Sequence, residues 1–206
     1  MNKILSLFLM ATMALLVGCS DNNDPKEGVQ YETLANNLAT YRLPPVTEVF
    51  SLNCGHCRTM EEVIPQLESL TNQSIGKVHV TFNESATVAA MIYYTAEMQV
   101  GGKPDRDMVN ELFAALQMGN GATMADKQRA IESVFHSRDL VSPYELDKAQ
   151  QAQMLGAIKI AEEITEKGQF KGVPTFVVNG KYVVLTSGHQ NAEGIADTIN
   201  YLINLK

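Results

Sequence analysis

The sequence is organised around the stretch VTEVFSLNCGHC, residues 46–57. Its first part is rich in β-branched and aromatic side chains, which predicts a short strand over residues 46–52. Residues 58–71 place their apolar side chains on one stripe of a helix. Cys54 and Cys57 therefore lie where a strand passes into a helix, with Cys54 at the helix start.

The close spacing of these two cysteines indicates chemistry rather than structural support. A disulfide stabilises a fold mainly by closing a long loop, and two intervening residues close almost none. The N–H groups and positive dipole at a helix N-terminus favour a thiolate, so Cys54 is the candidate nucleophile and Cys57 the resolving thiol. His56 can stabilise that thiolate; alternatively, it is an exposed residue. The alternatives to a redox-active pair are half of a metal site and an incidental disulfide bridge. No second C-x-x-C or H-x-x-x-H is present to complete a zinc site.

The N-terminal segment predicts export and lipid anchoring. The apolar run over residues 4–17 is too short to span a bilayer and fits the hydrophobic region of a signal peptide. It ends in LVGC, which resembles the bacterial lipobox, so we expect a signal peptide over 1–18, acylation of Cys19 and a lipidated tether over 19–28. The alternative is a structural or free cysteine. Ser20, directly after Cys19, resembles the residue that permits transfer to the outer membrane in enterobacterial sorting, so we expect the outer membrane.

The composition is that of an acidic globular protein. The chain has 206 residues, 16 basic and 23 acidic side chains and a net charge of −7. Its length suffices for one elaborated domain or two small ones. Nucleic-acid binding requires clustered Lys and Arg to neutralise phosphates, so we expect no nucleic-acid partner.

The rest of the chain predicts two kinds of structure. Residues 77–82 alternate like a strand, whereas 83–169 carry helical periodicity throughout. Within that block, residues 142–145 (SPYE) have the pattern of a helix start with a capping box. Residues 172–185 predict two strands joined by an Asn-Gly turn, and Asn191 can cap a final helix.

Glu48 is the unusual polar residue of the first predicted strand. Side chains alternate along a strand, and the face that carries Glu48 continues to Cys54. A carboxylate there is costly unless it is paired or protonated, and Lys77 on the neighbouring strand is the obvious counter-ion. We expect Glu48, directly or through water, to move a proton on or off Cys57. The alternative is an edge position open to water.

Three motifs together resemble the DsbA family of bacterial periplasmic thiol oxidases. They are FSLNCGHC at 50–57, GVPT at 172–175 and VNGKY at 178–182. The resemblance implies an α/β, thioredoxin-like fold formed by residues 29–82 and 170–206. An α-helical insertion domain over 83–169 is expected to interrupt it.

The resemblance also implies roles for further residues. The family's cis-proline falls on Pro174, preceded by Val173, whose backbone can pair with an extended substrate. Its buried acid and nearby lysine fall on Glu48 and Lys77. The Gly-His dipeptide between the cysteines departs from the family's common Pro-His and resembles protein disulfide isomerase, a milder oxidant.

We therefore expect a monomeric thiol:disulfide oxidoreductase in the bacterial periplasm, attached to a membrane only through its lipid. It would introduce disulfides into reduced exported proteins through Cys54 and Cys57, and a membrane partner resembling DsbB would reoxidise it. No cofactor or metal is expected. The alternatives are a disulfide reductase or isomerase and, from another class, a lipoprotein that binds copper through the two thiols.

Overall fold

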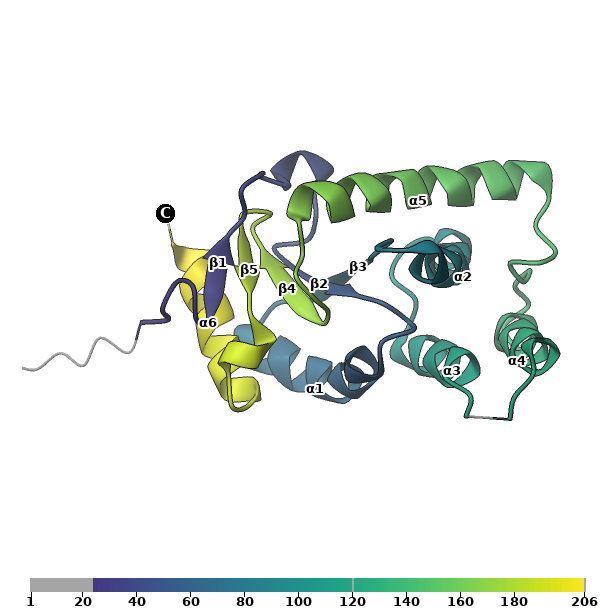
Figure 1. The fold of residues 1–206 in the computed structure, drawn as a ribbon, viewed down its shortest axis with the longest axis horizontal. Coiled ribbons are helices and arrows are strands. Elements are labelled where there is room, and N and C mark those ends of the chain that lie inside the picture. The colour runs from purple at the N-terminus through teal and green to yellow at the C-terminus, as the bar shows by residue number, and fades with distance from the viewer. Residues whose placement is uncertain (1–23, 120, 206) are drawn as a thin grey trace, which may run out of the picture.

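The computed structural model describes residues 24–119 and 121–205. Two parts lie side by side: a sheet covered by helices on both faces, and a group of helices next to it (Figure 1). The predicted signal peptide and Cys19 lie outside the described residues.

The sheet has five strands in the order β1-β5-β4-β2-β3. Strands β2 and β3 are parallel, and the other neighbouring pairs are antiparallel. The strands are β1 (Tyr31–Thr33), β2 (Val46–Phe50), β3 (Ile75–His79), β4 (Thr175–Val178) and β5 (Tyr182–Val184).

Helices cover both faces of this sheet because its strands are apolar on both sides. Helices α1 (Gly55–Thr71) and α6 (Ala192–Asn204) pack on one face, against Phe176 and Val178. The intervening Val177 points to the other face, which contacts the end of the long helix α5 (Lys148–Gly168). Figure 1 shows α5 on the opposite side of the sheet from α1 and α6. A short 3₁₀ helix, η1 (Ala39–Tyr41), precedes β2, and a second, η2 (Thr186–Gly188), precedes α6.

The remaining helices are α2 (Glu84–Val100), α3 (Arg106–Leu116) and α4 (Met124–His136). Helix α2 packs against α5, and α3 packs against α4. Their apolar side chains share one core with Phe50, Leu52 and Cys57. The strand-to-helix junction is therefore buried between the sheet and the helical part.

One predicted helix start is wrong. The Glu145 carboxylate accepts hydrogen bonds from Ser142 N (3.2 Å) and Ser142 Oγ (2.6 Å), but this arrangement closes a turn rather than opening a helix. Helix α5 begins later, where Asp147 and Gln150 form a capping box. A capping pattern thus fixes the local hydrogen bonds, whereas the following residues decide whether a helix propagates.

The strand predictions are right in kind and shifted in place. The strand expected over 77–82 is β3, which starts and ends earlier. The Asn-Gly hairpin is confirmed: Asn179 and Gly180 have φ of 52° and 63°, and Lys181 N donates to Val178 O at 3.0 Å. Strand β1 is too short to leave a pattern in the sequence, and it pairs with β5 at the edge of the sheet.

Candidate active site

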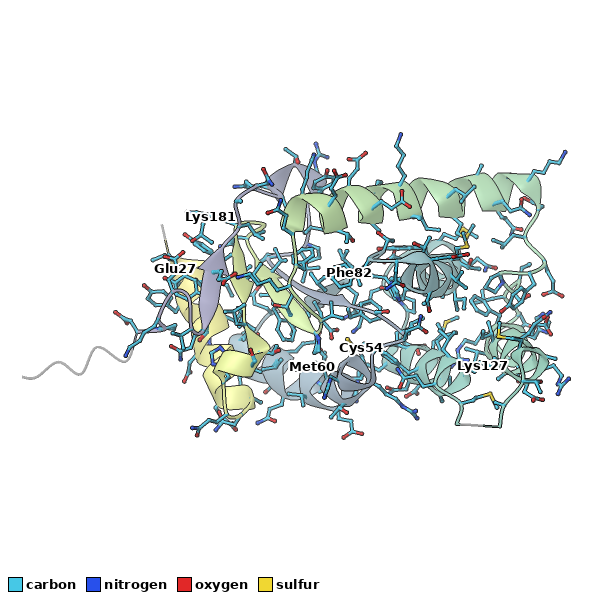
Figure 2. The ribbon with its side chains drawn as sticks, viewed as in Figure 1. Glu27, Cys54, Met60, Phe82, Lys127 and Lys181 are labelled. Atoms are coloured by element: carbon cyan, nitrogen blue, oxygen red, sulfur yellow. The ribbon has the colours of Figure 1, made fainter. Side chains whose placement is uncertain are left out.

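Cys54 is the N-cap residue of α1 and follows the loop that leaves β2. Its backbone is extended (φ −92°, ψ 116°), and its Sγ accepts a hydrogen bond from Cys57 N at 3.2 Å. Its own N–H donates to Ser51 O at 2.9 Å. Figure 2 shows Cys54 at the end of α1 that faces the helical part of the molecule. The structure holds both cysteines as thiols, with Cys54 partly exposed and Cys57 buried.

The pKa values of the two thiols are shifted in opposite directions. The pKa of Cys54 is lowered to about 6, chiefly because the Cys57 thiol donates a hydrogen bond to its sulfur; the backbone N–H groups of Cys57 and His56 add to this effect, and burial opposes it. The pKa of Cys57 is raised because its proton is held by the Cys54 sulfur and because burial disfavours a second anion. At neutral pH the pair is therefore a thiolate beside a thiol.

Glu48, Glu61 and Lys77 form a buried charge cluster near Cys57. Glu48 and Lys77 face each other across β2 and β3, and Lys77 Nζ donates to one oxygen of each carboxylate. The Glu48 side chain is 0% exposed, so the alternative of an edge position open to water is wrong. Sequence reasoning missed Glu61, although it lies one helical turn after Cys57, on the buried side of α1.

Burial is the main cause of the raised pKa of Glu48, and the one ammonium group that it shares with Glu61 does not offset it. Burial raises the pKa of Glu48 to about 7; Lys77 opposes this shift, while the charges of Glu61 and Cys54 add to it. The pKa of Lys77 is raised because the two carboxylates outweigh its burial. Among the described residues no donor reaches Glu48 Oε1. Glu48 can therefore gain or lose a proton near neutral pH.

Val173 and Pro174 lie beside the nucleophile. The peptide bond between them is cis, and the Val173 carbonyl oxygen is 3.5 Å from Cys54 Sγ. A cavity of about 270 Å³ opens there, and its lining includes Cys54, Val173 and Phe82, which is 45% exposed. The labelled Phe82 and Cys54 both lie between the sheet and the helices in Figure 2. An incoming chain can thus reach the sulfur and a backbone carbonyl together.

Two side chains without a predicted role contact the loop before Cys54. The His79 imidazole accepts a hydrogen bond from Leu52 N at 2.9 Å. The Gln117 amide donates to Leu52 O at 2.8 Å and to Cys54 O at 3.1 Å. No sequence signal marks these residues, because each acts through the backbone of a distant segment.

The described residues hold neither a metal-ion cluster nor a membrane span. In residues 24–119 and 121–205, no group of three or more His, Cys, Asp or Glu side chains is arranged to hold a metal ion. No helix in the same ranges combines the length and apolarity that a bilayer span requires.

Comparisons with known proteins give a consistent result. The thioredoxin family model matches residues 43–200. The thiol:disulfide interchange protein DsbA of Escherichia coli is 27% identical over 198 residues, which cover 88% of this chain and 89% of that protein. Crystalline DsbA from Proteus mirabilis superimposes with a TM-score of 0.65 at 23% identity, covering 88% of this chain and 98% of the other. A complex of that oxidoreductase with a non-covalently bound peptide, PWATCDS, gives a TM-score of 0.64 at 23% identity and covers 87% and 98%. The two structural similarities concern the fold.

Proposed function

We propose that this chain, which belongs to the thioredoxin family, introduces disulfides into reduced exported proteins. Within that family it is a thiol:disulfide oxidoreductase of the DsbA type. The reacting groups are the thiols of Cys54 and Cys57. The observation that supports oxidation of substrates, rather than their reduction, is the stabilised Cys54 thiolate. A fold that stabilises the reduced pair makes the disulfide a stronger oxidant, because reduction then releases free energy.

Oxidation begins when a substrate thiolate attacks Cys54 Sγ of the disulfide. The bond between the two active-site sulfurs breaks, and Cys57 leaves as a thiolate that must take up a proton because its pKa is high. A second substrate thiolate then attacks the substrate sulfur of the mixed disulfide and expels Cys54. Two electrons pass from the substrate to the enzyme. The lowered pKa of Cys54 makes it a good leaving group.

Glu48 supplies the proton for Cys57, directly or through water. Its pKa near 7 allows it to donate in the oxidising direction and to accept during reoxidation. The charge of Glu48 also raises the pKa of Cys57, so the protonation of one group affects the other. Lys77, which also pairs with Glu61, holds the Glu48 carboxylate in place.

Substrates dock in an extended conformation beside Cys54. The Val173 carbonyl accepts a hydrogen bond from the substrate backbone, and the neighbouring cavity receives one of its side chains. This mode suits unfolded chains, whose backbone is free to pair. The oxidised state is then regenerated by a membrane partner that resembles DsbB.

We further propose that the protein is a monomer held at the periplasmic side of a bacterial membrane by acylated Cys19, with the outer membrane favoured by Ser20. Expression of the full chain and of the variant Cys19→Ala, followed by membrane fractionation and mass spectrometry, tests the anchor. The lipidated protein should sediment with membranes. A wild-type chain released in soluble form without a lipid adduct contradicts the anchor and leaves the redox proposal untouched.

The reverse direction is the second candidate, because the Gly-His dipeptide resembles that of a milder oxidant. Refolding of reduced RNase by the oxidised protein and reduction of insulin by the reduced protein separate the two directions. The oxidised protein should restore RNase activity faster than glutathione disulfide alone, and Cys54→Ser should abolish the effect. Rapid insulin reduction without RNase oxidation contradicts the oxidase assignment.

A further inference from the structure

The peptide units just before the nucleophile are held by side chains from two distant elements. The loop over residues 51–54 links β2 to α1. Within it, Leu52 donates its N–H to His79 Nε2 at 2.9 Å and accepts at its carbonyl from Gln117 Nε2 at 2.8 Å. Gln117 Nε2 also donates to Cys54 O at 3.1 Å. Both backbone groups of Leu52 and the carbonyl of the nucleophile are thus fixed from outside the loop.

The Nε2 atom of His79 is the hydrogen-bond acceptor for the Leu52 N–H. Its Nδ1 lies 2.8 Å from Val80 O, so Nδ1 carries the proton and Nε2 keeps its lone pair for the Leu52 N–H. Burial lowers the pKa of the imidazole to about 4, which keeps it neutral at physiological pH. The Tyr94 hydroxyl accepts the His79 N–H at 3.1 Å, and the Phe50 ring packs edge-on against the imidazole. Because His79 lies in β3 and packs against Phe50 of β2, its imidazole cannot shift without disturbing the sheet.

Gln117 connects the helical part of the molecule to the same loop. It is the C-cap residue of α3, and its N–H donates to Phe113 O at 2.9 Å, which ties its backbone to the helix. Its amide then carries both hydrogen bonds across to the loop. A carbonyl oxygen can only accept hydrogen bonds, and the amide nitrogen of Gln carries two N–H donors. One Gln side chain can therefore bind two carbonyl oxygens at once.

We infer that Gln117 and His79 are positioning residues that set the reactivity of Cys54. The Cys54 thiolate is stabilised by the N–H of Cys57 only while Cys54 keeps the extended conformation of an N-cap residue. Gln117 and His79 fix that conformation by anchoring the carbonyl of Cys54 and the backbone of Leu52. In the disulfide form the S–S bond already restrains Cys54, so their effect falls mainly on the reduced form.

This inference deepens the proposed function, because stabilising the reduced form makes the disulfide more oxidising. Gln117→Ala removes both amide hydrogen bonds of the loop. We expect the Cys54 pKa, measured by thiolate absorbance at 240 nm, to rise. We also expect the equilibrium constant for oxidation of glutathione to fall by about threefold to tenfold, the change that corresponds to one hydrogen bond of ordinary strength.

Gln99→Ala is the matched control. Gln99 donates to Thr95 O at 3.0 Å and to Val141 O at 2.8 Å, and its Oε1 accepts from Val141 N at 2.9 Å. Its loss therefore removes two amide-to-carbonyl bonds, as in Gln117→Ala, and one further bond, all away from the loop. Urea unfolding should show a loss of stability in both variants, whereas only Gln117→Ala should shift the thiol pKa. Equal pKa values in Gln117→Ala, Gln99→Ala and wild type overturn the inference for Gln117.

A pair of His79 variants tests the second residue. His79→Gln places an amide oxygen where Nε2 accepts the Leu52 N–H, whereas His79→Leu leaves that N–H without an acceptor. The pKa of Cys54 should rise in the Leu variant and return towards wild type in the Gln variant. Identical pKa values in both variants overturn the role of His79. The readout needs no protein substrate, so it remains decisive even if the proposed direction of catalysis fails.

Discussion

At the scale of single residues, the two thiols differ because of where each one lies on α1. Cys54 precedes the first turn, where the N–H groups of the helix have no partners within the helix. Cys57 lies inside that turn, is 0% exposed and donates a hydrogen bond from its thiol to the Cys54 sulfur. The C-x-x-C spacing thus places one sulfur at the cap and the other in the first turn of the helix.

Selective alkylation follows from this difference. Iodoacetamide should modify reduced protein once, at Cys54, with a rate that rises through a midpoint near pH 6. Cys57 should stay unmodified up to pH 8, because its pKa is raised. Mass spectrometry of digested protein, quenched at intervals, measures both sites. Modification of Cys57 at a comparable rate contradicts the assigned roles.

The Glu48→Gln variant tests the proton transfer. Gln has nearly the same shape but cannot donate an acidic proton, so oxidation of a synthetic dithiol peptide should slow. The slowing should be greatest below the pKa of about 7, where wild-type Glu48 is protonated and able to donate. Stopped-flow rates from pH 5 to 8 measure this effect. Superimposable profiles would reduce Glu48 to a structural residue.

Glu97→Gln is the control for that experiment. Glu97 is a partly buried acid whose pKa is also raised by burial, but its partner is the Tyr93 hydroxyl, at 3.3 Å, and not the charge cluster. Its variant should keep the wild-type pH profile. Alkylation of Cys54 should be nearly unchanged in both variants, which separates proton transfer to Cys57 from activation of the nucleophile.

The sequence predicts only part of the site at this scale. The pairing of Glu48 with Lys77 follows from strand alternation and from the cost of a buried charge, and the structure places the two residues opposite each other. Glu61 has a local signal, its spacing of one helical turn from Cys57. His79 and Gln117 could not be found, because contacts between a side chain and a remote backbone leave no periodicity.

At the scale of elements, β2, β3 and α1 meet at the buried charge cluster. Each element contributes one member, so the cluster links strand pairing to the packing of the helix that carries the thiols. Removing its cation leaves two buried carboxylates without a partner. Such a loss is strongly destabilising, whereas replacing a whole buried pair by neutral groups is often tolerated.

Lys77→Met should therefore lower the free energy of unfolding by about 3–5 kcal/mol. Adding Glu48→Gln and Glu61→Gln to this variant should restore part of the loss, because no unpaired charge remains buried. Lys171→Met, which breaks the exposed pair with Glu32, should cost less than about 1 kcal/mol. Urea titrations measure all these variants. A similar loss from Lys77→Met and Lys171→Met would contradict the burial argument.

Element boundaries show where sequence reasoning loses accuracy. The Asn-Gly hairpin is right because its turn needs two residues with positive φ, a local requirement. The helix start expected at residues 142–145 is wrong because the same capping groups also close an isolated turn. Helix α1 starts at Gly55, three residues before the apolar stripe, because its first turn contains the redox motif.

At the scale of the whole molecule, the active site lies at the junction of two structural parts. The apolar core of the helical part includes Phe50, Leu52 and Cys57 from the thioredoxin-like part. Cys57 is therefore buried by the inserted helices as well as by the sheet, and the partly exposed Cys54 packs against the same core. The fold class was predictable from the order of periodic segments and from the three motifs, but this shared core depends on packing between segments remote in sequence.

The stability of the whole molecule should depend on redox state and pH together. The folded pKa of Cys54, about 6, lies below the unfolded value, so its stabilising effect is present above the unfolded pKa and is lost as the pH falls through 6. The disulfide form has no such titration. Reduced protein should therefore gain stability over oxidised protein as the pH rises from about 6 to about 8.5, the pKa of a free thiol.

Urea unfolding of both redox forms from pH 4 to 8.5 measures this difference. The raised pKa of Glu48 acts in the opposite direction, losing stability as the pH rises through about 7, but it does so in both forms and largely cancels. The difference should be flat below pH 5. A difference that is independent of pH would show that the Cys54 thiolate is not stabilised by folding.

The reduction potential of the Cys54–Cys57 pair, obtained by equilibration with glutathione, tests the central claim most directly. A stabilised thiolate together with a Gly-His dipeptide predicts an oxidising pair, with a potential near about −180 mV and above the range of about −200 to −230 mV typical of glutaredoxins. Gln117→Ala should lower this potential and Gln99→Ala should not. A wild-type value near about −270 mV, typical of thioredoxin, would contradict the account and make the protein a reductase.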